Sequence, residues 1–201
     1  MGKAQIMQQN ILNQVLNDID QFNLNDPNRQ FDELGNIHPK EFLYGKRMSN
    51  CLHDFMLSPP AQLQIAARAQ HIGRWLSPRS DYPEGRAGYL KWRKDLGSKH
   101  AELCADIMRK YQLDEAQIEA TCSLLRKEKL KQNPLTQALE DVICLVFLKY
   151  YFLEFANKHE QAKVISIVQK TWAKMSAEGQ KAALALELPS PALRLVQQAL
   201  A

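Results

Sequence analysis

Hydrophobic residues recur at helical spacing along almost the whole chain. Near the N-terminus, Leu12, Val15, Ile19 and Phe22 fall three or four residues apart and form one face. No stretch alternates clearly enough between apolar and polar residues to predict a strand. We therefore expect an all-α protein, with helices near residues 5–22, 40–57, 60–76, 87–110, 115–131, 135–157, 160–175, 177–185 and 191–200.

Side chains that can cap a helix stand at several of these helix starts. Ser58, Asn133 and Ser190 each precede a proline, and Asp114 and Ser176 lie at two further starts. The chain has no internal repeat and no long linker between these starts. We therefore predict a single domain over residues 1–201.

The helix near 135–157 is apolar on nearly every side between Val142 and Phe155. Such a pattern is typical of a helix that other helices surround. We expect this segment to be the central helix of a bundle of about eight or nine helices.

The composition narrows the class and the location. Hydrophobic residues make up 45% of the chain and charged residues 24%, as in ordinary globular proteins. The four cysteines lack the close spacing of a zinc site and predict buried free thiols in a reducing compartment. The N-terminus is polar, and the longest apolar stretch, Val142–Leu148, is too short to cross a bilayer. We expect a cytoplasmic protein with no membrane partner.

Two polar positions interrupt faces that should be apolar. His100 falls in the same stripe as Leu96 and Leu103, so its ring nitrogens need hydrogen-bond partners or a metal. Asp141 is in line with Leu145 and Leu148 and follows a second acid, Glu140. A buried carboxylate requires a metal or another cation, so Asp141 either binds a metal or pairs with an arginine such as Arg47.

A third break lies in the helix near 60–76. Gln64, Arg68, His71 and Trp75 form one stripe, beside an apolar stripe on the same helix. A solvated face more usually carries Lys and Glu, so this set favours a functional role. On the preceding helix, Glu41 interrupts an otherwise apolar stripe in a similar way.

Basic and aromatic residues are concentrated in segment 68–94. Guanidinium groups bind phosphate through paired donors, and aromatic rings can stack on a base. The net charge of +4 is compatible with such anionic partners. The candidate ligand-binding residues are Arg47, Arg68, Arg74, Arg79, Arg93, Trp75 and Trp92.

Several motifs occur together and cover most of the chain: His38–Met48, Ala69–Trp75, Pro78–Ser80, Tyr82–Pro83, Gly88–Arg93, His100–Glu102, Leu139–Leu148 and Lys170–Ser176. As a set they resemble one family, known only as domain of unknown function 4202. The family carries no established activity, so the resemblance implies no function.

More distantly, the layout is similar to that of the HD-type metal-dependent phosphohydrolases, which are all-helical. That family places a His-Asp doublet on a helix of small residues, a later histidine, and an aspartate on a central helix. Here Gln70-His71 stands in place of the doublet, and His100 and Asp141 follow. The resemblance implies a divalent metal ion (Mn, Zn, Fe or Mg) held by His71, His100 and Asp141.

These observations predict a metal-dependent hydrolase that acts on a phosphorylated or nucleotide-like small molecule. The metal would activate water, the arginines would neutralise phosphate, and Glu41 or Glu140 would act as general base. One alternative is a non-enzymatic module that binds a nucleotide or RNA through segment 68–94. A di-iron oxygenase of the HD type and a scaffold role are the others. The sequence leaves the substrate and the oligomeric state open.

Overall fold

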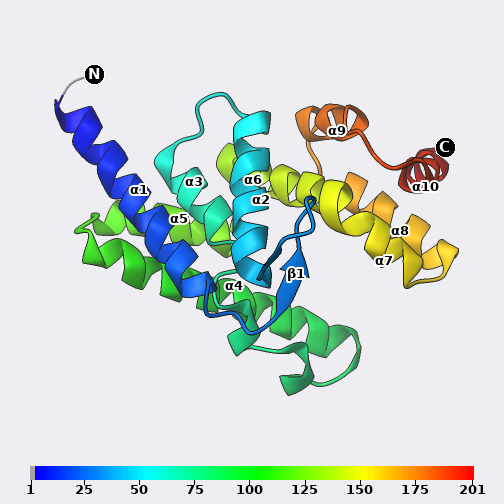
Figure 1. The fold of residues 1–201 in the computed structure, drawn as a ribbon, viewed down its shortest axis with the longest axis horizontal. Coiled ribbons are helices and arrows are strands. Elements are labelled where there is room, and N and C mark those ends of the chain that lie inside the picture. The colour runs from blue at the N-terminus through cyan, green and yellow to red at the C-terminus, as the bar shows by residue number, and fades with distance from the viewer. Residues whose placement is uncertain (1–2) are drawn as a thin grey trace. The chain divides into compact units, whose positions relative to one another are not determined.

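A computed structural model of the protein describes residues 3–201, and over that range the chain forms ten α-helices and one small hairpin (Figure 1). The all-α prediction is therefore confirmed. The contacts within the chain divide it into two compact units, with the boundary between Lys129 and Leu130.

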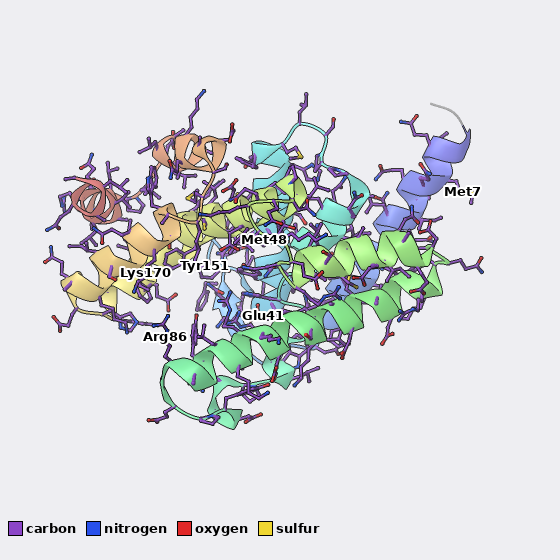
Figure 2. The ribbon with its side chains drawn as sticks, turned by 180° about the vertical axis from the view of Figure 1, so that it is seen from behind. Met7, Glu41, Met48, Arg86, Tyr151 and Lys170 are labelled. Carbon is purple, nitrogen blue, oxygen red and sulfur yellow. The ribbon has the colours of Figure 1, made fainter. Side chains whose placement is uncertain are left out.

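The first unit holds five helices and the hairpin. α5 packs along α4, and α3 packs against both α2 and α5; Figure 1 shows α4 and α5 side by side. The elements are α1 (Lys3–Asn23), β1 (Arg29–Phe31), β2 (Ile37–Pro39), α2 (Lys40–Phe55), α3 (Ala61–Arg68), α4 (Gly85–Lys110) and α5 (Glu115–Leu125). Its core includes Val15, Ile19, Met48, Leu52, Leu63, Ile72, Met108 and Leu124, and Figure 2 labels Met48.

The hairpin is a correction to the expectation that the chain has no strand. β1 and β2 pair antiparallel, with Gln30 opposite His38. The strands are only three residues long, and their apolar residues Phe31 and Ile37 are exposed. The two strands therefore lack the alternation of buried apolar and exposed polar residues that predicts a strand from sequence. The turn is held instead by Asp32, whose carboxylate accepts hydrogen bonds from the backbone N–H groups two and four residues later.

Two helices end earlier than the sequence pattern predicts. α3 stops at Arg68 and is followed by a turn in which Gly73 has φ +64°, a conformation that glycine adopts at little cost. A short 3-10 turn, Arg74–Leu76, completes the segment expected to be helical. α5 stops at Leu125, because Lys127 takes a left-handed φ of +57° and its N–H turns back to the carbonyl of Leu124.

The second unit holds the remaining five helices. The predicted central helix is present as three consecutive parts: α6 (Pro134–Val146), a π-helical turn (Phe147–Tyr151) and α7 (Phe152–Asn157). α6 packs against α9, and α10 packs against α7 and α8. The other elements are α8 (Gln161–Trp172), α9 (Ala177–Leu184) and α10 (Ser190–Leu200). Figure 2 labels Tyr151 in the π-helical turn and Lys170 on α8.

The predicted caps are confirmed at three helices and wrong at two. Asp114, Asn133 and Ser176 each accept a backbone N–H at the start of a helix. Ser58 lies too far before α3, which starts after two prolines, and Ser190 is itself the first residue of α10. At both of these helix starts the N-cap position holds a proline, Pro60 and Pro189, which has no side-chain acceptor for a capping hydrogen bond.

The sequence also led to expectations about the cysteines and about membrane-spanning helices. All four cysteines are buried free thiols, as predicted. Within residues 3–201, no helix combines the length and the apolar character needed to span a bilayer.

Candidate anion-binding site

Glu41 is fixed at the first turn of α2 and is buried, with 5% of its surface exposed. Its backbone N–H donates to the carboxylate of Asp26, and its carbonyl accepts from the side chain of Asn23. Figure 2 labels Glu41. Burial raises the pKa of its carboxyl group, and the positive charge of Arg74 opposes that shift. A buried carboxylate in this position needs a hydrogen-bond donor.

His71 supplies that donor from the turn after α3. The turn packs closely against α4 at Gly73, where an added Cβ would lie 2.7 Å from Leu103 Cδ1. The backbone N–H of Gly73 donates to the side-chain oxygen of Asn23. This geometry brings the His71 ring over Tyr44 of α2, with the two ring centroids 3.8 Å apart and their planes 11° apart. The stacked tyrosine holds the imidazole in one orientation.

The hydrogen bonds of His71 define its tautomer. Its Nδ1 lies 3.0 Å from Glu41 Oε2, and its Nε2 lies 2.7 Å from Arg74 Nη1. A guanidinium group can only donate, so Nε2 carries the lone pair and Nδ1 carries the proton given to Glu41. Burial, followed by the charges of Arg74 and Arg93, holds the pKa of His71 well below its ordinary value. The ring is therefore neutral at pH 7.

His100 lies nearby on α4 and adopts the same tautomer. Its Nδ1 donates to the carbonyl of Ile72 over 2.7 Å, and the His71 and His100 ring centroids are 6.1 Å apart. Burial, followed by the neighbouring His71, lowers the pKa of His100 to about 3. The prediction that His100 faces the core is confirmed, since only 4% of its surface is exposed.

Both histidines line a pocket of about 230 Å³ that lies within the first unit. Five basic side chains and one acidic side chain contribute to its wall, so an anion is favoured over a cation. The wall is formed by the turn after α3, by one face of α4 and by the end of α5: Gln70, His71, Arg74, Arg93, Lys94, Leu96, Gly97, Ser98, His100, Leu125, Arg126, Lys127 and Glu128.

Of the arginines predicted to bind phosphate, the structure brings Arg74 and Arg93 into this pocket. Arg93 makes no hydrogen bond or ion pair within residues 3–201 and is exposed. The other three are engaged elsewhere in the first unit. Arg47 pairs with Glu33, Arg68 with Asp20, and Arg79 with backbone carbonyls of residues 82, 83 and 85.

The two predicted tryptophans are not part of the pocket wall. Trp92 is buried, donates its indole N–H to the carbonyl of Ser77, and packs under the Arg74 guanidinium at 5.1 Å. Trp75 packs against Phe22, with the ring centroids 5.8 Å apart. Neither ring is presented as an open platform for a base.

Both predicted acids of α6 have partners within the second unit. Asp141 accepts the N–H and the hydroxyl of Ser176 and the amide of Gln137, so it stabilises the start of α9. Glu140 is buried and lies 3.8 Å from the ammonium group of Lys174. The surroundings of Asp141 leave little space, because a side chain at Gly179 would lie 2.5 Å from its Oδ1.

The residues as arranged do not fit the predicted divalent metal. No group of three or more His, Cys, Asp and Glu side chains within residues 3–201 is placed to hold a metal ion. The lone pair of His71 Nε2 accepts from Arg74, and the oxygens of Asp141 already accept from Ser176 and Gln137. Cationic side chains also dominate the wall of the pocket beside the histidines.

Several residues that form the site were not among the individual candidates from the sequence, although Lys94 lies within the basic segment 68–94. Gln70, Lys94 and Lys127 all line the pocket, and Tyr44 orients His71. Gln70 stands beside a candidate histidine, which was the one available signal. Lys127 enters the wall only because the chain turns left-handed after α5, which residue periodicity does not reveal.

The fold and the site define an all-helical protein with a basic pocket built around two neutral histidines. The profile of the family described as Domain of unknown function (DUF4202) matches residues 13–196. The chain therefore belongs to this family, and that part of the prediction is confirmed. No curated protein and no solved structure matches the chain.

Proposed function

We propose that the first unit binds a phosphorylated small molecule in this pocket and hydrolyses its phosphate ester, with His71 as the general base. One observation carries the proposal: the buried carboxylate of Glu41 holds His71 with its Nε2 lone pair directed to Arg74, in the wall of a basic pocket. A carboxylate–imidazole pair of this kind can take a proton from water and stabilise the resulting imidazolium.

Arg74 takes part both in phosphate binding and in control of the base. In the structure its guanidinium donates to His71 Nε2 and so occupies the base. A phosphate dianion attracts that guanidinium through paired hydrogen bonds, which releases the lone pair. The dianion also counters the arginine charges that lower the pKa of His71, so the imidazole becomes a stronger base when the substrate is present.

The hydrolytic step then needs only water and this chain's own residues. His71 Nε2 removes a proton from a water molecule as its oxygen attacks phosphorus, and the bond from phosphorus to the ester oxygen breaks. Arg74 and Arg93 neutralise the charge on the phosphoryl oxygens. The proton held by His71 passes to the departing ester oxygen, which leaves an alcohol and inorganic phosphate.

The test measures phosphate release from a panel of phosphate monoesters and nucleoside monophosphates, together with binding of inorganic phosphate. We expect Glu41→Gln and His71→Gln to lower kcat by roughly 10²-fold or more while inorganic phosphate still binds. The matched control is Glu102→Gln, an exposed acid on α4 outside the pocket.

Unchanged turnover in Glu41→Gln would contradict the assigned base. Binding of nucleotides without any phosphate release would instead favour the non-enzymatic binding module. If neither inorganic phosphate nor any ester binds, the pocket is not an anion site and the proposal fails.

A further inference from the structure

The Gln70 side chain is one of the polar groups of the pocket that the hydrolytic step does not use. Gln70 lies beside His71 in the turn after α3 and lines the pocket, although only 6% of its surface is exposed. Its side-chain oxygen, Oε1, is buried and has no hydrogen-bond partner. Buried polar atoms without partners are rare in folded proteins and call for an explanation.

The chemistry of this atom restricts what can satisfy it. A side-chain carbonyl only accepts hydrogen bonds, so the oxygens of a phosphate monoester dianion, which carry no proton, cannot bind it. Arg74 and Arg93 in the same wall carry the N–H donors that a phosphate requires. A ligand that satisfies both parts of the wall must carry an O–H or N–H donor a short distance from its phosphate.

The dimensions and lining of the pocket favour a small ligand. Its volume of about 230 Å³ is below the roughly 300–1,000 Å³ typical of sites for drug-sized molecules. Trp75 and Trp92 are outside the wall, so a nucleobase would lack a stacking partner there. The polar wall residues Gln70 and Ser98 suit hydroxyl groups instead.

We infer that the substrate is a phosphate monoester of a small hydroxylated molecule, and that the Gln70 amide recognises one of its hydroxyl groups. This inference rests on the proposed function, because it assumes that the phosphate occupies the basic part of the same pocket. Gln70 is then a specificity-determining residue, and the hydroxyl of the substrate donates to Oε1.

The experiment compares two ligands that differ in hydroxyl groups: glycerol 1-phosphate and propyl phosphate, with inorganic phosphate as the reference. We expect the wild-type protein to bind glycerol 1-phosphate about tenfold or more tightly than propyl phosphate, by titration calorimetry. Gln70→Met keeps the size of the side chain but removes the amide, so it should bring this ratio close to one and leave the affinity for inorganic phosphate unchanged.

The matched control is Gln64→Met on α3, whose amide donates to the carbonyl of Pro59 and which lies outside the pocket wall; it should retain the preference. Equal affinity of the wild-type protein for the two esters, or a preference that survives in Gln70→Met, would overturn the inference while leaving the proposed function in place. Failure of all three ligands to bind would overturn both. If Gln70→Met does not fold, the wild-type comparison still decides the substrate class.

Discussion

At the scale of single residues, the site depends on where protons lie. His71 and His100 both donate Nδ1–H to a fixed acceptor, Glu41 Oε2 and the Ile72 carbonyl respectively. Each ring thus carries its lone pair on Nε2, which in His71 accepts from Arg74. Each ring is neutral because its pKa lies below the ordinary value. Neutral imidazoles avoid adding further positive charge to a wall that is already basic.

The low pKa of His100 predicts loss of stability in acid. In the unfolded chain His100 binds a proton near pH 6.5, whereas in the folded protein it binds one only near pH 3. The unfolded state therefore gains protons first as the pH falls. We expect His100 to lower the free energy of unfolding by about 2 kcal/mol between pH 7 and pH 5, measured by urea unfolding.

A His100→Asn variant should show a smaller loss of stability over the same interval, and His71 acts in the same direction. The control is His53→Asn, an exposed histidine on α2 in the same unit, which should leave the pH dependence unchanged. An equally steep dependence in His100→Asn would show that His100 is not the group that resists protonation.

At the scale of elements, the same type of residue stabilises a helix start in one place and lies beside the candidate site in another. Glu41 and Asp141 are both buried acids on helices. Glu41 meets an imidazole in a pocket, whereas Asp141 meets the backbone N–H and hydroxyl of Ser176 at the start of α9. Sequence periodicity identified both as inward-facing but could not show which partner each one meets.

The role of Asp141 gives a second prediction. Asp141→Ala removes three hydrogen bonds around the start of α9, so we expect a loss of about 2 kcal/mol in the free energy of unfolding. Affinity for inorganic phosphate should not change. Calorimetric melting and phosphate titration measure the two effects.

Glu178→Ala is the matched control, because Glu178 is an exposed acid in the first turn of α9, the helix whose start Asp141 contacts. It should cost far less stability. A folded and stable Asp141→Ala protein that no longer binds phosphate or hydrolyses an ester would contradict the structural role and would restore Asp141 as a candidate ligand.

Periodicity predicted the all-α class and the inward face of His100 because both depend on local spacing. It failed at the ends of α3 and α5, where single residues, Gly73 and Lys127, adopt left-handed backbone conformations. Those two turns carry Gln70, His71 and Lys127 into the pocket wall. The site was therefore predictable in its histidines and in two of its arginines, but not in the residues that irregular backbone supplies.

At the scale of the whole molecule, the family match covers residues 13–196 and so includes parts of both units. The pocket is built by the first unit alone. The positive charge of its wall has the same sign as the net charge of +4. Arg93 and Lys94 are exposed, so their positive potential extends into the solvent. Screening by salt should weaken capture of an anion here, as for any exposed charged site.

The most direct test of the account follows the ring signals of the two histidines by NMR while inorganic phosphate is added at pH 7. Before addition, both rings should be neutral, with the proton on Nδ1. Phosphate should shift the His71 signals most and move that ring toward the protonated form, because Arg74 transfers to the anion. Histidine signals that stay unchanged at saturating phosphate, or a His71 ring already charged without it, would contradict the central claim.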